Sequence, residues 1–366
     1  MSSSAPHRLI PILLLCLLTL VMLSGCGNEN PAQVRDFRIK YFRHKLYDVH
    51  FSDDRNGWIC GDYGLIWKTT DGGNTWAPLT SGTILPLRGL SFSDAQNGWA
   101  VGDQGTILHT KDAGATWKRQ EAGTSEHFLD VAFLDDRTGF AIGVFATLLQ
   151  TEDGGEHWEN ISERVKEKEK EFQFFIDEEG TTKEDEEALT EGEIDVSEEG
   201  MPVLEPLLNR IFFLDKAQGW IVAEEGNIFH TKDRGKSWAK QDSGAVADLF
   251  SVYFKNPEEG WITGLNGLLL HTMDGGEHWE SQPCPVNETL FSIVVTEKRG
   301  YAVGNAASII TTTDGGKTWE PFALENIVLY SWLRDLKYVE KKFIAIGGLG
   351  TILINDTSGE DWRQVL

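Results

Sequence analysis

The strongest constraint on the fold is an eight-residue motif that recurs along the chain. Its pattern is Thr-x-Asp-x-Gly-x-Thr/Ser/His-Trp. The six complete copies begin at Thr69, Thr110, Thr151, Thr231, Thr272 and Thr312. A degenerate seventh copy ends at Trp362, keeps Gly359 and carries Thr357 where the aspartate would stand. Successive motif tryptophans are 41, 41, 80, 41, 40 and 43 residues apart, so one interval holds a repeat plus an insertion of roughly 39 residues.

A glycine–aromatic pair repeats in phase with this motif. The pairs are Gly57-Trp58, Gly98-Trp99, Gly139-Phe140, Gly219-Trp220, Gly260-Trp261 and Gly300-Tyr301, with Lys342-Phe343 in the seventh unit. Two markers therefore agree on seven units. Each unit contains four short apolar runs separated by turn residues, which is the size of one propeller blade. We predict an all-β fold, a seven-bladed β-propeller with four-stranded antiparallel blades, over residues 35–366.

The motif itself is typical of a hairpin turn. A carboxylate can accept hydrogen bonds from turn N–H groups, the glycine permits a positive φ, and the tryptophan ring packs under the hairpin. Because the same turn recurs in every blade, we predict a structural role for its aspartates, Asp71, Asp112, Asp153, Asp233, Asp274 and Asp314. Three histidines that precede the motif at one repeated position are likewise predicted to be packing residues: His109, His230 and His271.

The N-terminus resembles a bacterial lipoprotein signal. Residues 1–8 are mildly basic and residues 9–22 are apolar, too short a run for a membrane span. Leu23-Ser24-Gly25-Cys26 follows and resembles a lipobox, so we expect a signal peptide over 1–25, lipidation of Cys26 and a tether over 26–34. The alternative is an ordinary secretory signal. Because Gly27 is not aspartate, attachment to the outer membrane, facing the periplasm, is favoured over the inner membrane.

The insertion is strongly acidic. The chain carries a formal net charge of −24, and residues 163–200 hold 16 acidic and 5 basic residues. Such a charge argues against binding to nucleic acid. The insert, 163–203 between blades three and four, has two interpretations. It is a solvated flap, or, because it contains an apolar cluster at Phe172–Ile176, a lid or docking element for a partner.

Propeller geometry predicts two different faces. Glycine-flanked strings such as Gly61–Gly64 predict tight hairpins between second and third strands, on the same face as the crossovers between blades and opposite the repeated motif. Arg88, Arg210 and Arg334 stand near the beginnings of first strands on this face, pointing toward the channel mouth. Three roles are open for them: pairing with Asp48, Asp130 and Asp335, forming a binding patch, or forming a catalytic triad.

The motif resembles the Asp-box of BNR repeats, which occur in sialidases, sortilin-like receptors and photosystem II stability and assembly factors. The last of these is the closer resemblance, because Phe51-Ser-Asp53…Gly57-Trp-Ile-Cys-Gly61 and Phe92-Ser-Asp94…Gly98-Trp-Ala-Val-Gly102 match its Phe-x-Asp…Gly-Trp-x-x-Gly pattern. The resemblance covers residues 35–366 apart from the insert. It implies a non-enzymatic, lipid-anchored scaffold that binds a membrane protein through arginines near the channel, here Arg88, Arg210 and Arg334.

We therefore expect the client to be a membrane protein or envelope complex, either photosystem II-like or an exporter, and we expect no cofactor, metal or catalytic residue. The alternative is a sialidase-like propeller that binds or hydrolyses glycans. It lacks support in the sequence, since no Arg-Ile-Pro string and no tyrosine–glutamate pair accompany the three arginines. Two further questions stay open at this stage: whether residues 35–40 add a strand to the last blade, and whether Cys60 and Cys284 form a disulfide.

Overall fold

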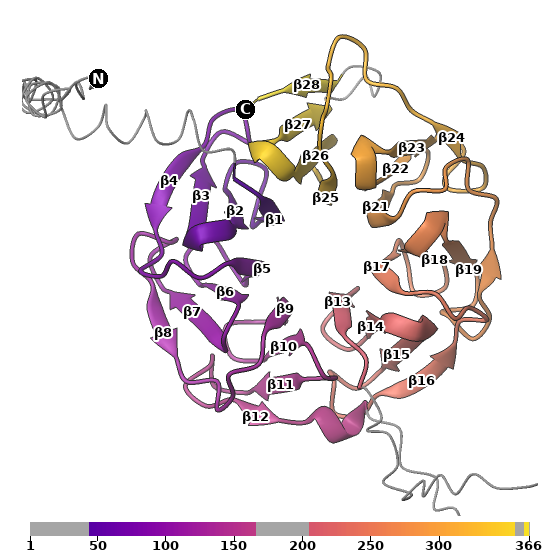
Figure 1. Ribbon diagram of the computed structural model, residues 1–366. Coiled ribbons are helices and arrows are strands. Elements are labelled where there is room, and N and C mark those ends of the chain that lie inside the picture. Colours follow the sequence, from indigo (N-terminus) through magenta and orange to yellow (C-terminus); the bar gives the residue numbers. More distant parts are fainter. Residues whose placement is uncertain (1–43, 166–204, 356–361, 366) are drawn as a thin grey trace, which may run out of the picture. The chain divides into compact units, whose positions relative to one another are not determined.

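A computed structural model describes residues 44–165, 205–355 and 362–365. Within these residues the chain forms seven four-stranded antiparallel sheets arranged as the blades of a ring (Figure 1). The four strands of every blade are consecutive in sequence, and each first strand lies at the centre of the ring. The predicted seven-bladed β-propeller is therefore confirmed.

The strand bounds follow the repeat. Blade 1 contains β1 (Leu46–Phe51), β2 (Gly57–Gly61), β3 (Leu65–Thr69) and β4 (Ala77–Thr80). Blade 2 contains β5 (Leu87–Phe92), β6 (Gly98–Gly102), β7 (Thr106–Thr110) and β8 (Lys118–Gln120). Blade 3 contains β9 (Phe128–Phe133), β10 (Gly139–Gly143), β11 (Leu148–Thr151) and β12 (Glu159–Asn160). Blade 4 contains β13 (Leu208–Phe213), β14 (Gly219–Ala223), β15 (Asn227–Thr231) and β16 (Ala239–Asp242).

The remaining three blades repeat this order. Blade 5 contains β17 (Leu249–Phe254), β18 (Gly260–Gly264), β19 (Leu269–Thr272) and β20 (Glu280–Ser281). Blade 6 contains β21 (Leu290–Val295), β22 (Gly300–Gly304), β23 (Ile309–Thr312) and β24 (Glu320–Pro321). Blade 7 contains β25 (Leu333–Val339), β26 (Lys342–Gly347), β27 (Ile352–Asn355) and β28 (Trp362–Gln364). Short 3-10 turns are η1 (Asp62–Gly64), η2 (Ser162–Arg164), η3 (Glu224–Gly226), η4 (Leu265–Gly267), η5 (Asn305–Ala307) and η6 (Gly348–Gly350).

Blades pack on one another through the aromatic residues of the glycine–aromatic pairs. Trp58 is fully buried, stacks on Phe92 of the next blade at 3.7 Å between ring centroids, and donates from Nε1 to the carbonyl oxygen of Ala113. Trp99 does the same one blade later, on Phe133 at 3.5 Å. Each such pair contributes about 0.5–1.5 kcal/mol beyond the apolar area that it buries. The blade interfaces, and not the blades alone, therefore form the core.

The Asp-box turns have the expected hydrogen bonds. In the first copy Asp71 Oδ1 accepts from Thr69 Oγ1 at 2.8 Å and from the backbone N–H of Thr75 at 2.9 Å, and Asp71 Oδ2 accepts from Thr75 Oγ1 at 2.6 Å. The same contacts occur at Asp112, Asp153, Asp233, Asp274 and Asp314, with histidine replacing the last threonine at Asp153 and Asp274. In each described copy the carboxylate is occupied by its own turn.

Hydrogen bonds between loops assign the two faces. The backbone N–H of Gly72, in an Asp-box turn, donates to the carbonyl of Arg55 between β1 and β2, so these loops share one face, which we call the Asp-box face. On the other side, a Cβ at Gly64 would lie 2.0 Å from the carbonyl oxygen of Thr83 in the crossover to blade 2. The loops between second and third strands therefore lie against the crossovers, on what we call the crossover face.

The tight hairpins predicted between second and third strands contain two neighbouring left-handed residues. In the first blade they are Tyr63 (φ 54°) and Gly64 (φ 68°), and the N–H of Leu65 donates to the carbonyl of Asp62. The second glycine is thus a central residue of the turn, where its positive φ matters.

The first residues of the predicted insert, 163–165, pack against the propeller at the crossover from blade 3 to blade 4. Arg164 Nη1 donates to Gln150 Oε1 at 2.8 Å and to the carbonyl oxygen of Gly235 in blade 4 at 3.0 Å. Val165 is buried in the core between the two blades. The rest of the predicted insert lies outside the described residues, as do Cys26 and the segment 35–40. Cys60 and Cys284 are both free thiols.

Candidate partner-binding face

Every first strand has the same register irregularity near its start. A one-residue shift separates its first and third residues relative to the second strand. The second residues of the seven strands are Tyr47, Arg88, Leu129, Asn209, Phe250, Phe291 and Arg334. The third residues are Asp48, Gly89, Asp130, Arg210, Ser251, Ser292 and Asp335. Arg88 and Arg334 are thus equivalent to each other, whereas Arg210 belongs to the other set.

Arg210 is bound by carboxylates from three other blades. Its guanidinium lies 3.1 Å from Asp335, 3.4 Å from Asp130 and 3.7 Å from Asp48. Each carboxylate also accepts a hydrogen bond from a backbone N–H of the following blade's first strand: Asp48 from Leu90, Asp130 from Ile211 and Asp335 from Val49. This group, which we call the channel clamp, ties neighbouring blades together around the axis.

The charges of the channel clamp are balanced internally. Burial and the neighbouring Asp335 raise the pKa of Asp48 well above its usual range. Burial alone would also raise the pKa of Asp335, but Arg210 and Lys337 outweigh it and lower that pKa. Lys337 also lies near this pair, 3.2 Å from Asp335 and 3.9 Å from Asp48. Arg210 therefore has its ionic partners within the channel clamp, which leaves it poorly placed to bind a ligand.

Arg88 has one carboxylate partner among the residues that the structure describes. Its Nε and Nη2 donate to the two oxygens of Asp103 at 2.6 and 3.3 Å, and His127 lies 3.2 Å from the same carboxylate. The guanidinium carbon is 5.3 Å from the centre of the Tyr47 ring. Arg88 is therefore held in place at the channel mouth, and its positive charge is paired with the Asp103 carboxylate.

Arg334 has no ion pair among the residues that the structure describes. Its guanidinium carbon lies 4.9 Å from the centre of the Phe291 ring, and the side chain is partly buried. Burial, followed by the positive charge of Arg210, lowers the pKa of Arg334 from its usual value. A carboxylate placed beside it would relieve both effects. Arg334 is therefore the arginine best suited to bind an anion.

A pocket of about 290 Å³ joins Arg88 and Arg334 at the channel mouth. Its walls come from five blades and comprise Tyr47, Arg88, Leu129, Phe291, Trp332 and Arg334. The Tyr47 and Trp332 rings are stacked across the contact between blades 1 and 7, with centroids 6.1 Å apart. Two guanidinium groups against aromatic walls suit an anionic group that carries an apolar neighbour. We call this the mouth pocket.

The mouth pocket refines the arginine prediction. The structure brings Arg88 and Arg334 together in one pocket and places Arg210 in the channel clamp, so the three arginines do not converge as a sialidase triad requires. Of the expected acidic partners, all three contact Arg210, and none forms an ion pair with Arg88 or Arg334 among the described residues. The sequence prediction missed the aromatic walls. The second position of each first strand, which recurs with the repeat, was the signal that could have found Tyr47 and Phe291.

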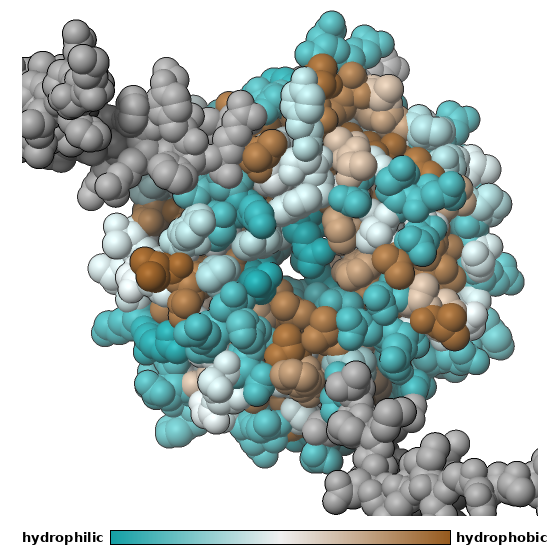
Figure 2. Space-filling model, viewed as in Figure 1, coloured by the Kyte–Doolittle hydropathy of each residue, from teal (hydrophilic) through white to brown (hydrophobic). Residues whose placement is uncertain are grey.

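Large apolar side chains are exposed mainly on the crossover face. Nine large hydrophobic residues are exposed in the described ranges, and seven of them lie in its loops, namely Tyr63, Ile84, Phe145, Val246, Val328, Tyr330 and Leu349. Val246 and Tyr330 are 92% and 82% exposed. Figure 2 shows hydrophobic side chains at several places around the central opening. This distribution favours the crossover face as the place where a partner binds.

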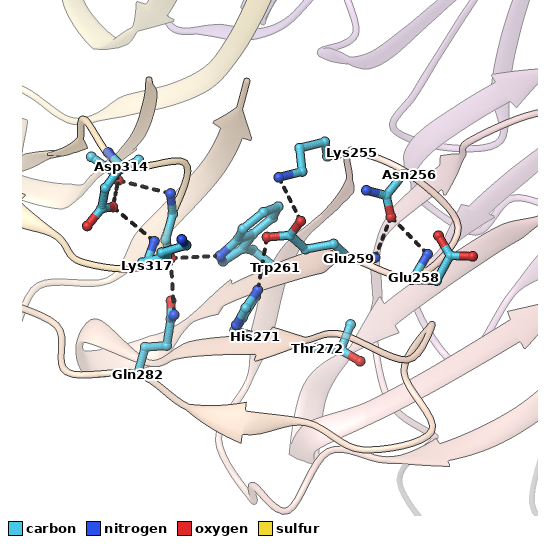
Figure 3. Close-up of polar contacts among 12 residues, drawn as sticks. Lys255, Asn256, Glu258, Glu259, Trp261, His271, Thr272, Gln282, Asp314 and Lys317 are labelled. Carbon is cyan, nitrogen blue, oxygen red and sulfur yellow. Dashed lines mark hydrogen bonds and ion pairs between the residues drawn. The ribbon is translucent and has the colours of Figure 1, made fainter. Parts of the chain in front are cut away.

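The opposite face is occupied by contacts within the propeller. Between blades 5 and 6, Trp261 Nε1 and Gln282 Nε2 donate to the carbonyl oxygen of Gly316 at 3.3 and 3.1 Å (Figure 3). Beside them Glu259 pairs with Lys255 at 2.6 Å and with His271 at 3.5 Å (Figure 3). The bonds to Gly316 join blades 5 and 6, and the Glu259 pairs join strands and loops within blade 5, which agrees with a structural role for this face.

In the part of the chain that the structure describes, no group of three or more histidine, cysteine, aspartate or glutamate side chains could hold a metal ion. In the same residues no helix is long and apolar enough to cross a membrane.

Sequence comparison decides the family. A family model described as photosynthesis system II assembly factor YCF48 matches residues 32–123, 117–182 and 199–290, which together exceed half of the chain. The chain belongs to the YCF48 family. A BNR/Asp-box repeat model also matches residues 310–321, in blade 6. No curated protein matched the sequence.

Solved structures agree with the YCF48 fold. YCF48 bound to a D1 peptide and YCF48 from Cyanidioschyzon merolae each align with a TM-score of 0.65 and 18% identity. The alignments cover 87% of this chain and 95% and 97% of those chains. A GH74 xyloglucanase from Xanthomonas campestris aligns with a TM-score of 0.64 and 12% identity, over 88% of this chain and 54% of its own. At these identities the similarities establish the fold alone. The YCF48 assignment rests on the family model.

Proposed function

We propose that this chain is a non-enzymatic assembly factor that binds a segment of a membrane protein at the mouth pocket. The observation that carries the proposal is Arg334, a partly buried cation without an ion pair in the described residues, beside aromatic walls on the most apolar face. A YCF48 structure with a D1 peptide supports the kind of ligand, a peptide from a membrane protein. The client is a photosystem II-like complex or an exporter of the envelope.

Arg88 and Arg334 have different roles in the proposed site. Arg88 is already fixed by Asp103 and serves to position the Tyr47 wall. Arg334 supplies the uncompensated charge, and Phe291 and Trp332 supply apolar surface for the residue next to the anion. A charge-assisted hydrogen bond of this kind is worth about 1.5–3 kcal/mol, which is enough to orient a peptide but leaves most of the affinity to the surrounding face.

The binding test is crosslinked capture of clients from membranes by the full chain. We expect Arg334→Ala to reduce capture of the main client about tenfold or more. A matched control is Lys236→Ala, which removes one positive charge from an exposed position on the Asp-box face and should leave capture unchanged. Equal capture by both variants would contradict the proposal. Turnover of a fluorogenic sialoside that is lost in Arg88→Ala or Arg334→Ala would replace it with the glycosidase alternative.

We further propose that a lipid on Cys26 holds the protein to the membrane, facing the periplasm, at the outer membrane and not the inner one. The lipobox-like sequence and Gly27 support this arrangement. Substitution Cys26→Ser should abolish labelling by a radioactive fatty acid and move the protein from the membrane fraction to the soluble fraction. A variant that stays in the membrane without label would show that another segment anchors it. Density-gradient separation of the two membranes tests the location.

A further inference from the structure

The two faces of the propeller carry different mixtures of charge. In the described loops of the Asp-box face, 19 acidic residues are accompanied by 12 lysines and arginines. In the described loops of the crossover face, 11 acidic residues are accompanied by only Lys45 and Arg164. Arg164 is already bound to Gln150 and Gly235. The loops around the mouth pocket therefore carry mainly negative charge, although Lys45 is exposed and Arg119 of β8 donates to the carbonyl oxygens of Gln104 and Gly105.

Several of these acidic side chains are exposed and have no ion pair in the described residues. They are spread over four crossovers and hairpins of the ring: Glu121, Glu225, Glu288 and Glu325. Exposed apolar residues lie near two of them. The backbone N–H of Glu225 donates to Asp248, two residues after Val246, and Val328 follows Glu325 within one crossover. We call these four glutamates and their apolar neighbours the rim.

We propose that the partner segment is a cationic, amphipathic polypeptide whose lysines or arginines face the rim while one carboxylate enters the mouth pocket. Charge complementarity carries this inference. A surface of one sign attracts ligands of the opposite sign over about a Debye length and discriminates against partners of like charge. The exposed apolar side chains of the rim match the apolar face of such a segment. An anionic lipid surface has the wrong sign for this face.

The inference rests on the proposed function, because it describes the ligand of the same face, but it depends on different residues. The mouth pocket needs Arg334 and a carboxylate. The rim needs its glutamates and the cations of the ligand. The two can therefore fail separately.

The test uses two synthetic peptides with the full chain in detergent. Both contain alternating apolar and charged residues and end in a free carboxylate; one carries lysines, the other glutamates at the same positions. We expect the lysine peptide to bind at least about tenfold more tightly at low salt, with an association rate that falls steeply as salt is added. Equal affinity of the two peptides, or equal binding of vesicles rich in anionic lipid, overturns the inference.

Two matched variants show where the lysine peptide binds. The rim variant changes Glu121, Glu225, Glu288 and Glu325 to glutamine. The control variant removes the same charge from exposed acidic residues of the Asp-box face, changing Asp54 to asparagine and Glu152, Glu156 and Glu258 to glutamine. The rim variant should lose about tenfold in affinity, and the control less than about twofold. An equal loss in both variants indicates general electrostatic attraction and overturns the inference.

The same peptides separate this inference from the proposed function. Amidation of the peptide's C-terminus removes the carboxylate that Arg334 would bind. If Arg334→Ala weakens the free-acid peptide but not the amide, the mouth pocket is occupied as proposed. If Arg334→Ala has no effect while the rim variant does, the proposed anion site is wrong and the cationic partner stands.

Discussion

The channel clamp and the mouth pocket lie one residue apart on first strands. Each contains arginine, but in the clamp the arginine joins blades, whereas in the pocket it is available to a ligand. In the clamp, Arg210 is bound by three carboxylates that also hold backbone N–H groups, so its charge is consumed in joining blades. In the pocket, Arg334 lies on an aromatic ring without an ion pair in the described residues. The difference teaches that an arginine near a propeller axis indicates a ligand only where no carboxylate balances its charge.

The largest expected effect comes from the clamp. Arg210→Met keeps the apolar stem and removes the charge. Asp130 then has no ion pair among the described residues, and Asp48 and Asp335 keep only Lys337, so the free energy of unfolding should fall by about 3–5 kcal/mol. Urea unfolding followed by tryptophan fluorescence measures it. A variant as stable as the parent would show that the backbone N–H groups alone hold the carboxylates, and that Arg210 does not stabilise the fold.

A pair of deletions locates the boundary between propeller and insert. Replacing residues 168–203 with a short glycine-serine linker should leave thermal unfolding nearly unchanged, since charge-dense sequence buries little apolar surface. Replacing residues 163–203 also removes Arg164 and buried Val165, and should cost about 2 kcal/mol or more. The measurement is the difference in stability between the two deletion variants, compared by thermal unfolding. Equal stability of the two deletions would mean that the contacts of Arg164 and Val165 contribute nothing.

Substitution of the arginine in the mouth pocket should have little effect on stability, unlike substitution of the arginine in the clamp. Arg334→Met keeps contact with Phe291 and removes a charge that lies near Arg210, so the free energy of unfolding should change by less than about 0.5 kcal/mol. Measured beside Arg210→Met under identical conditions, it separates a residue kept for binding from one kept for stability. A loss of several kcal/mol would place Arg334 in the fold instead.

The smallest effect is a dependence on pH. His50 lies in the clamp strand β1, and burial, followed by the charge of Lys337, lowers its pKa to about 4, whereas in the unfolded chain the value is about 6.5. Between these values the unfolded chain binds more protons, so stability falls as the pH is lowered from about 6.5 to 4. The melting temperature of His50→Gln should fall less steeply over this range. Parallel curves for variant and parent would assign the dependence to other groups, such as His109 and His230, whose pKa values burial also lowers to about 4.

Much of the fold could be predicted because its determinants are local and repeated. Each Asp-box closes its turn within eight residues, and each Gly–Trp pair places its ring at the same blade interface, so spacing alone reported the number of blades. The candidate site depends on a register shift of one residue near the start of each first strand. Because of this shift, residues at the second position line the mouth pocket, whereas residues at the third position belong to the channel clamp. The repeat gives Arg334 the second and Arg210 the third position of a first strand, but the sequence does not show which carboxylates of other blades surround each arginine. The stack of Tyr47 on Trp332 joins residues far apart in sequence, and for that reason it was also missed.

The mouth pocket crosses the junction where the two ends of the ring meet. Tyr47 comes from the first blade, Trp332 and Arg334 come with the last, and the Val49–Asp335 hydrogen bond closes the same junction between residues 286 positions apart. During synthesis the blades can form one after another, but this contact cannot exist until the final blade has been made. The proposed binding site is therefore complete only when the ring has closed. A nascent or truncated chain has no complete site, and a client that binds the finished one also stabilises the closed ring by mass action.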